Sequence, residues 1–245
     1  MRPIVACLML CLTASCAPAQ ESAAPRETAL ELVLLADASG SIDAGELAFQ
    51  RQGYAEALRD PAVLAAIEGT LYGSIAVTYV EWATNQSVVA GWTLIDGPEA
   101  AEAFGAAILA GPRGAYGSNA IGAALLEGAR LIEQNDIAAP RRVIDFSGDS
   151  MGNSSGPPIA TAREAVVARG ITINALPIGC ESCPGRAGRD LERLYAEAII
   201  GGPGAFLVTA ETRARFGEAL RRKLILEIAG PLGSGETRRL AEALR

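Results

Sequence analysis

The sequence predicts an α/β fold with a doubly wound, mostly parallel central sheet, helices on both faces and one antiparallel edge strand. Several apolar runs lack polar alternation, which is typical of parallel strands that are buried on both faces. Segments of helical periodicity lie between these runs, and such alternation favours a single wound sheet. Residues 74–82 and 87–94 are rich in β-branched and aromatic residues, with Thr84 and Asn85 between them. They therefore predict a hairpin that places one antiparallel strand at the edge of the sheet.

The first half of the chain adds one buried strand and three helices to this hairpin. Residues 30–36 (LELVLLA) form a continuous apolar run and predict the first strand. A helix over residues 43–59 is expected to begin at Asp43, because Asp43 and Glu46 have the spacing of a capping box. Helical patterns follow at residues 98–110 and 121–134, separated by a glycine-rich loop at 111–118.

The second half continues the alternation. Residues 142–147 (RVIDFS) predict a strand, and a loop rich in Gly, Ser and Pro follows it. The helix expected at 159–169 should end at Gly170, a residue that suits a left-handed helix cap. Residues 171–178 (ITINALPI) predict another buried strand. The remaining expected elements are helices at 190–199 and 211–228 and a short strand at 205–208.

The composition limits the classes of function. The 245 residues include 21 Lys and Arg against 28 Asp and Glu, a formal net charge of −7. A chain this acidic is a poor candidate for nucleic-acid binding, which depends on clustered cations. The sequence contains no histidine. This excludes Ser-His-Asp and Cys-His nucleophile systems and every His-ligated metal site.

The amino-terminal residues predict export. Residues 1–19 combine Arg2 with a short apolar run and end in Ala-Pro-Ala, a small-x-small pattern that precedes cleavage. An alternative lipoprotein signal would end before Cys16, and lipidation there is the one membrane attachment expected. The mature protein is then periplasmic or secreted, either free or lipid-anchored. The expected boundaries are a signal peptide at 1–19, a linker at 20–28, one domain at 29–229 and a tail at 230–245.

Two cysteines, Cys180 and Cys183, remain in the mature domain with Cys-x-x-Cys spacing. Such a pair can be redox active, half of a zinc site or a local disulfide. Zinc is disfavoured because a second pair of ligands is missing. A thioredoxin-like motif should open a helix, whereas here Pro184 and Gly185 continue the loop. In an oxidising compartment we favour a small disulfide between the two cysteines.

Oxygen-bearing side chains follow the predicted strands, at the edge where open α/β sheets bind ligands. Asp37, Ser39 and Ser41 come directly after the first strand. Ser118 opens the helix after the glycine-rich loop, and Asp149 follows a later strand. Hydroxyls and two carboxylates, without nitrogen or sulfur donors, suit a hard divalent cation: Mg²⁺ foremost, with Mn²⁺ or Ca²⁺ as alternatives. Without a cation, the two carboxylates would repel each other.

These motifs resemble, in order along the chain, the metal-ion-dependent adhesion site of von Willebrand factor type A domains. Asp37-x-Ser39-x-Ser41 is similar to the first motif of that site. Ser118-Asn-Ala-Ile-Gly-Ala-Ala-Leu is similar to the second, with serine where the family has threonine. Asp149 stands where the family has the aspartate of its third loop. The resemblance covers nearly all of the mature chain. More narrowly, the chain resembles an exported proteobacterial branch of these proteins.

The resemblance implies a Rossmann-like von Willebrand factor A fold and a role in binding, with no catalytic residues. In the family the three hydroxyls contact the ion directly, the two aspartates bind it directly or through water, and an open coordination position takes a carboxylate of the partner. The implied ligand is therefore an unknown protein with an exposed Asp or Glu. Because the third motif reads Gly-Asp-Ser instead of Thr-Asp-Gly, Asp145 is the alternative to Asp149, and Asn119 could add an amide oxygen.

Two other functions remain open: a metal-assisted hydrolase, and a structural domain of this fold without bound metal. The Gly-Asp-Ser segment resembles that of a class of hydrolases, but those enzymes need a histidine base. The loop at 111–117 lacks the Gly-Lys-Ser/Thr ending of a phosphate loop, and we expect it to form a flexible rim around the metal. Trp82 and Trp92 are expected to pack in the core and the hairpin.

Overall fold

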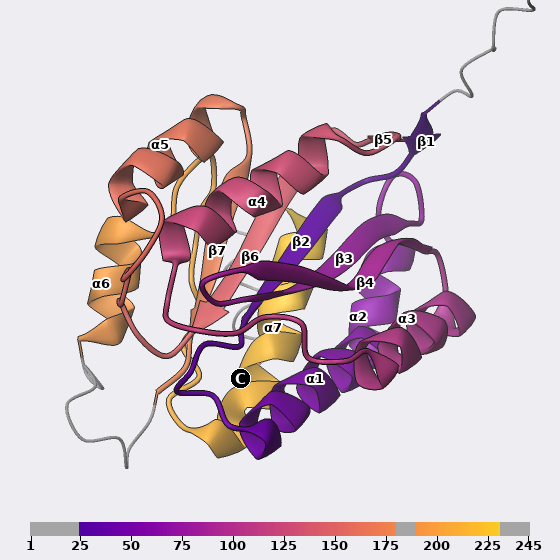
Figure 1. Cartoon of the computed structure of the whole chain (residues 1–245). Helices are drawn as coiled ribbons and strands as arrows, with labels where there is room; N and C mark the ends of the chain where they lie inside the picture. The colour runs from indigo at the N-terminus through magenta and orange to yellow at the C-terminus, as the bar shows by residue number, and fades with distance from the viewer. Residues whose placement is uncertain (1–24, 180–189, 231–245) are drawn as a thin grey trace, which may run out of the picture.

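A five-stranded sheet runs through the centre of the structure (Figure 1), a computed structural model that describes residues 25–179 and 190–230. Its strands are β2 (Glu31–Asp37), β3 (Ile75–Trp82), β4 (Gln86–Ile95), β6 (Arg142–Gly148) and β7 (Thr172–Pro177). They lie in the order β4-β3-β2-β6-β7. All neighbours are parallel except β4, which pairs antiparallel with β3 at one edge. The predicted sheet and its antiparallel edge strand are confirmed.

Helices cover both faces of this sheet (Figure 1). One face carries α1 (Ala44–Leu58), α2 (Pro61–Glu68), α3 (Pro98–Ala110) and α7 (Phe216–Ala229). The opposite face carries α4 (Ile121–Glu133), α5 (Ile159–Ala168) and α6 (Leu191–Ala198). Each face has its own hydrophobic core, so the sheet is a shared middle layer and the fold is doubly wound, as predicted.

The central strand β2 shows why its residues 32–36 are all apolar. Leu32 and Leu34 belong to the core under α1 and α7, whereas Val33 and Leu35 belong to the core under α4. Successive side chains of a strand point to opposite faces, so a strand between two cores must be apolar throughout. All four side chains are completely buried.

Local signals set several helix ends as predicted. Asp43 Oδ1 accepts a hydrogen bond from Glu46 N at 2.8 Å, and Asp43 N donates to Glu46 Oε2 at 2.9 Å. This is the expected capping box at the start of α1. Gly170 follows the end of α5 with φ of +72°, a conformation that glycine adopts without the steric cost of a side chain.

The short helix α2 is absent from the sequence-based prediction. Its first residue, Pro61, follows the N-cap Asp60, whose Oδ1 accepts a hydrogen bond from Ala62 N at 2.8 Å. Asp-Pro is a recognisable helix start. However, the helix has eight residues, and only Val63 and Ile67 are buried. That is too short a segment for periodicity to reveal.

The carboxyl-terminal part differs from the prediction in two places. Residues 205–208 do not form a regular strand, because only isolated bridges join Leu207 to Ala175 and Ala210 to Ile178 along the edge of β7. The helix expected at 211–228 begins later, at Phe216, after a 3₁₀ turn at Arg213–Arg215. Neither element has a side-chain N-cap hydrogen bond, so this start has no strong sequence signal.

A small two-stranded sheet lies beside the central one. It pairs β1 (Arg26–Glu27) in parallel with β5 (Ile137–Ala138). Next to β1, Thr28 is completely buried, and its hydroxyl donates to the Ser74 carbonyl oxygen at 2.8 Å. The last residues of the expected linker thus contact the folded domain.

Other expectations fall on parts of the chain outside the described residues. These are the signal peptide at 1–19, most of the linker and tail, and the pair Cys180 and Cys183. In the described segments, every helix is too short or too polar to cross a lipid bilayer.

Candidate metal centre

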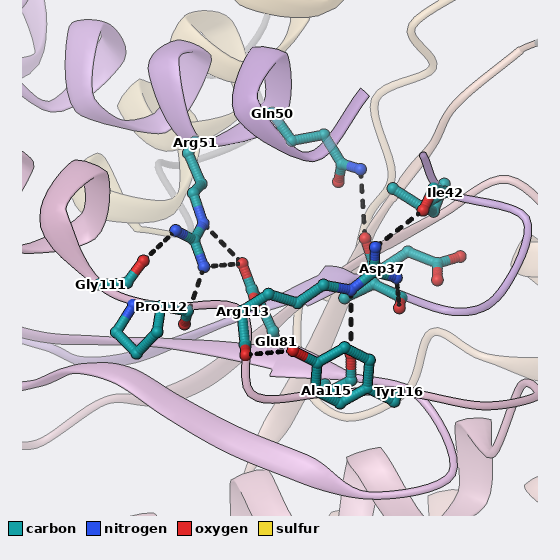
Figure 2. Close-up of polar contacts among 11 residues, drawn as sticks. Asp37, Ile42, Gln50, Arg51, Glu81, Gly111, Pro112, Arg113, Ala115 and Tyr116 are labelled. Atoms are coloured by element: carbon teal, nitrogen blue, oxygen red, sulfur yellow. Dashed lines mark hydrogen bonds and ion pairs between the residues drawn. The ribbon is translucent and has the colours of Figure 1, made fainter. Parts of the chain in front are cut away.

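Asp37 is the last residue of β2, where the parallel strands end. Its Oδ1 accepts a hydrogen bond from Ser39 N at 2.8 Å, which turns the chain back over the end of the strand. Gln50 of α1 donates to the Asp37 backbone oxygen at 3.1 Å (Figure 2). Asp37 and Ser39 are buried, whereas Ser41 is exposed, and the two serine Oγ atoms are 3.3 Å apart. The first motif therefore holds a carboxylate inside and a hydroxyl at the surface.

The second motif contacts the first through the backbone. Gly40 N donates to the Gly117 carbonyl oxygen at 2.7 Å, directly before Ser118. The Thr84 hydroxyl accepts from Ser118 N at 2.9 Å and donates to the Ser118 carbonyl oxygen at 3.2 Å. The backbone of Ser118 is thus held by one side chain, while Ser118 itself is exposed.

The third motif begins where β6, the neighbour of β2, ends. Asp149 follows Gly148, at which a Cβ atom would lie 3.2 Å from Asp37 Oδ2. Glycine therefore lets this loop approach the Asp37 carboxylate closely. Asn119 Nδ2 donates to Ser150 Oγ at 2.5 Å, so the second and third loops also touch. The structure brings the three loops that carry all five predicted ligands together.

The charges of Asp37 and Asp149 act on neighbouring groups in the same buried space. Burial raises the pKa of Asp37 to about 7. Hydrogen bonds from Ser39 and from the backbone of Asp149 lower this pKa, whereas the negative charge of Asp149 raises it. The pKa of Tyr195 is also raised, first by burial and then by the charges of Asp37 and Asp149. The Tyr195 hydroxyl donates to the Ser150 carbonyl oxygen at 3.1 Å. Two carboxylates that share a buried space repel each other unless a cation or protons neutralise them.

The donor set fits a hard divalent cation. Asp37 Oδ2 is buried and has no hydrogen-bond partner among the described residues, so it is available to a ligand. In residues 25–179 and 190–230, no three or more acidic or cysteine side chains are grouped to hold a metal. A cation bound here would therefore need hydroxyl oxygens to complete its coordination shell. Ser41 and Ser118 are exposed, which leaves this side open to solvent.

Asp145 does not belong to this site. It lies within β6 opposite Leu34, and its Oδ1 is 2.6 Å from Nζ of Lys223 on α7. Its side chain is completely buried. The alternative in which Asp145 replaces Asp149 as a ligand is therefore wrong, because Asp145 is enclosed in the core against α7.

Arg113, which no sequence signal indicates, anchors the first motif. Its guanidinium donates to the carbonyl oxygen of Ile42 at 3.1 Å (Figure 2). It also donates to the carbonyl oxygens of Ala38 at 2.6 Å and Ser39 at 3.3 Å. The Tyr116 ring centroid lies 5.4 Å from the guanidinium carbon. These contacts to the first motif join positions more than 70 residues apart, so no local pattern predicts them.

Arg51 anchors the other end of the same loop. It forms a buried ion pair with Glu81 of β3 at 2.7 Å and donates to the carbonyl oxygens of Gly111 and Pro112 (Figure 2). The loop at 111–117 therefore lies beside the first motif, and contacts of Arg51 and Arg113 hold it there. That it forms a rim around a metal stays a prediction.

Trp82 is completely buried in the core, and Trp92 is partly buried with its Nε1 donating to the Leu131 carbonyl oxygen at 3.3 Å.

Comparison with known sequences identifies one family. The family model described as "Protein of unknown function (DUF1194)" matches residues 27–232. This range includes the whole central sheet and all five predicted ligands. No curated protein matches the sequence.

Solved structures share the fold at low sequence identity. The von Willebrand factor type A protein from Catenulispora acidiphila has a TM-score of 0.57 and 16% identity, over 83% of this chain and 43% of that chain. The pilus adhesin SpaC from Lactobacillus rhamnosus GG has a TM-score of 0.56 and 12% identity, over 84% of this chain and 32% of that chain. Proximal thread matrix protein 1 from the mussel byssus was solved with a zinc-occupied MIDAS motif. It has a TM-score of 0.54 and 15% identity, over 84% of this chain and 49% of that chain. These similarities confirm the predicted von Willebrand factor A fold, and the chain spans less than half the length of each of these proteins.

Proposed function

The chain belongs to the DUF1194 family and has the von Willebrand factor A fold, and on this basis we propose that it binds another protein through a divalent cation. The proposed partner contributes a carboxylate from an exposed Asp or Glu. The proposed ligands from this chain are Asp37, Ser39, Ser41, Ser118 and Asp149.

The observation that carries this proposal is the burial of the Asp37 carboxylate beside a second negative charge. Its Oδ2 is buried without a hydrogen-bond partner among the described residues, and the charge of Asp149 acts on it. A buried carboxylate in this state is unfavourable unless a proton or a cation compensates it. The exposed hydroxyls of Ser41 and Ser118 supply further oxygen ligands and an opening to solvent. The buried carboxylate and the exposed hydroxyls together support a bound cation that a partner protein can reach from the solvent.

We propose Mg²⁺ as the ion, with Mn²⁺ and Ca²⁺ as alternatives. Carboxylate and hydroxyl oxygens are the ligands that these hard cations prefer. The zinc-occupied motif of the mussel protein supports a divalent cation in a site of this kind. When bound, the cation supplies an open coordination position for a carboxylate of another protein.

Binding is favoured over catalysis by the residues around the site. Asp37 and Asp149 would act as ligands, which leaves neither free to serve as a general base, and the chain has no histidine. An adhesin and a matrix protein are among the structures with this fold, which supports an interaction role. The rival functions are a metal-assisted hydrolase and a structural domain without metal.

We further propose that the protein acts in the bacterial envelope, as a periplasmic or secreted protein. The support is the apolar segment and the Ala-Pro-Ala pattern within residues 1–19. Mass spectrometry of the mature amino terminus distinguishes cleavage before Gln20 from lipidation at Cys16.

Calorimetric titration of chelator-treated protein with Mg²⁺, Mn²⁺ and Ca²⁺ tests the metal site. One binding event is expected for the wild type, and it should be lost in Asp37→Ala. Ser118→Ala should weaken affinity by about tenfold or more, because it removes one ligand oxygen while leaving the backbone contacts of Ser118 intact. Asp136→Ala is the matched control, since Asp136 is an exposed carboxylate paired with Arg26 away from the site.

Circular dichroism of each variant confirms that loss of binding is not loss of folding. A folded wild type that binds none of the three ions at millimolar concentration would contradict the proposal and favour the structural domain. Turnover of ester or phosphoester substrates that disappears in Asp37→Ala would favour the hydrolase instead.

A further inference from the structure

Lys223 is the only lysine among the 245 residues, and its side chain is completely buried. Its Nζ lies 2.6 Å from Asp145 Oδ1 on β6 and 2.5 Å from Glu227 Oε1, one turn further along α7. Both acidic side chains are also completely buried. The protein therefore places its single side-chain amine between two carboxyl groups in the core, away from the candidate metal centre.

Helix and sheet geometry hold the three groups together. Lys223 and Glu227 are four residues apart and so lie on the same face of α7. Asp145 stands between Leu34 of β2 and Asn174 of β7 in the register of the sheet. Asn174 Nδ2 donates to Glu227 Oε1 at 3.0 Å and orients the glutamate. The contact therefore joins a regular strand, β6, to a regular helix, α7.

The surroundings disfavour separated charges. The Phe206 ring centroid lies 5.9 Å from Lys223 Nζ, and the hydrophobic core under α7 encloses the cluster. Burial is the largest cause that raises the pKa of both acids, and it raises that of Glu227 to about 7. Interactions with Lys223 and Glu227 act in the opposite direction and lower the pKa of Asp145. The amine therefore meets the Asp145 carboxyl group at close range, 2.6 Å from Oδ1.

We propose that Lys223 and Asp145 join in an intramolecular amide bond between Nζ and Cγ, with Glu227 as the proton carrier. The neutral amine attacks Cγ of the carboxylic acid, and an N–C bond forms. Glu227 takes a proton from the attacking nitrogen and returns it to the hydroxyl of Asp145. The C–O bond then breaks and the hydroxyl leaves as water. The step is a condensation that needs no oxidant, reductant or other reactant.

Two physical effects favour this condensation in the core. Fixed neighbouring groups react as if at very high concentration, because no translational freedom is lost on the way to the bond. A dry environment also disfavours the reverse hydrolysis and makes a neutral amide preferable to a buried ammonium and carboxylate. Arginine could not replace Lys223 in this step, since its guanidinium stays protonated.

Digestion of the reduced and unfolded wild type with a lysine-specific protease tests the bond. An unmodified chain is cut once, after Lys223, because there is no other lysine. The amide-linked chain should remain uncut. Quantitative cleavage after Lys223 would overturn the proposal.

Trypsin provides a second, positive measurement. The expected product is a branched species that joins residues 143–163 to residues 223–238, with a mass lower than the sum of the two peptides by one water, about 18 Da. A free 143–163 peptide together with a peptide beginning at Leu224 would contradict the bond.

The role of Glu227 is tested with Glu227→Gln, which keeps the size of the side chain but removes the carboxylate. This variant should fold, lack the branched species and be cut after Lys223. Glu218→Gln is the matched control, because Glu218 is an exposed acid on the same helix, and it should retain the bond. A Glu227→Gln protein that still forms the branched species would show that Glu227 is not the proton carrier.

Discussion

Asp37 and Glu227 are both buried acids whose pKa is raised to about 7, yet they occupy different chemical settings. Asp37 ends a strand and leaves one carboxylate oxygen without a hydrogen-bond partner among the described residues. Glu227 is enclosed in the core and contacts Lys223 and Asn174. The sequence indicates the first residue because strand-end loops have a recognisable pattern. It does not indicate the second, because a single acid in a helix is most often exposed.

Glu227 should make folding stability depend on pH. Its pKa is about 7 in the folded protein against 4.5 for the ordinary side chain, so the folded state keeps a proton that the unfolded state has lost. Stability from this group is complete below about pH 4.5 and is lost as pH rises through about 7. The free energy of unfolding of the wild type, relative to Glu227→Gln, should therefore fall by at most about 3 kcal/mol over this range.

Urea unfolding of both proteins at several pH values between 4.5 and 7.5 measures this difference. Acids outside the Lys223 cluster titrate in both proteins, and the amide bond of the wild type adds a difference that does not change with pH, so the pH dependence of the difference reports on the cluster of Glu227. A difference that stays constant or rises with pH would contradict the expected sign.

At the scale of elements, the loop at 111–117 shows how tertiary contacts complete a motif. Arg113 donates to three carbonyl oxygens of the first motif, and Arg51 ties the start of the loop to α1 and β3. The flanking helices and strands have clear local signals, and most of their predicted bounds agree with the structure within one or two residues. The loop has no such signal, because its conformation depends on arginine contacts to distant backbone.

Replacement of Arg113 by alanine should loosen the first motif. Several buried carbonyl oxygens would lose charged hydrogen-bond donors, at a cost of about 1–3 kcal/mol in the free energy of unfolding. Hydrogen exchange of the metal-free protein should become faster at the amides of residues 38–42. Arg193→Ala is the control, because Arg193 forms exposed ion pairs on α6 and should change stability by no more than about 0.5 kcal/mol. Unchanged exchange at 38–42 in a folded Arg113→Ala protein would contradict the anchoring role.

At the scale of the whole molecule, β6 takes part in two features that are each built from segments far apart in the sequence. The candidate metal centre lies at the carboxyl ends of β2 and β6, whereas the Lys223–Asp145 contact joins β6 to the helix that closes the fold. Each depends on the strand order β2-β6-β7, which brings early and late segments of the chain side by side.

An amide bond between Lys223 and Asp145 should shorten the chain that mechanical unfolding releases. Residues 146–222 would stay in a closed loop when the protein is pulled by its ends. The contour length of the wild type should therefore be shorter than that of Lys223→Arg by about 280 Å, at ~3.6 Å per residue. Force spectroscopy measures this length directly, and equal lengths for two folded proteins would contradict the bond.

The sequence by itself determined the fold class, the main strands and helices, and the spacing of the oxygen-bearing side chains within each loop. These features depend on residues close together in the chain, whose periodicity and turn chemistry act locally. Tertiary structure alone decided that Asp145 meets Lys223 and that Arg113 anchors the first motif. Those contacts depend on which strands become neighbours and in which register, and this is settled only when both faces of the sheet are buried together.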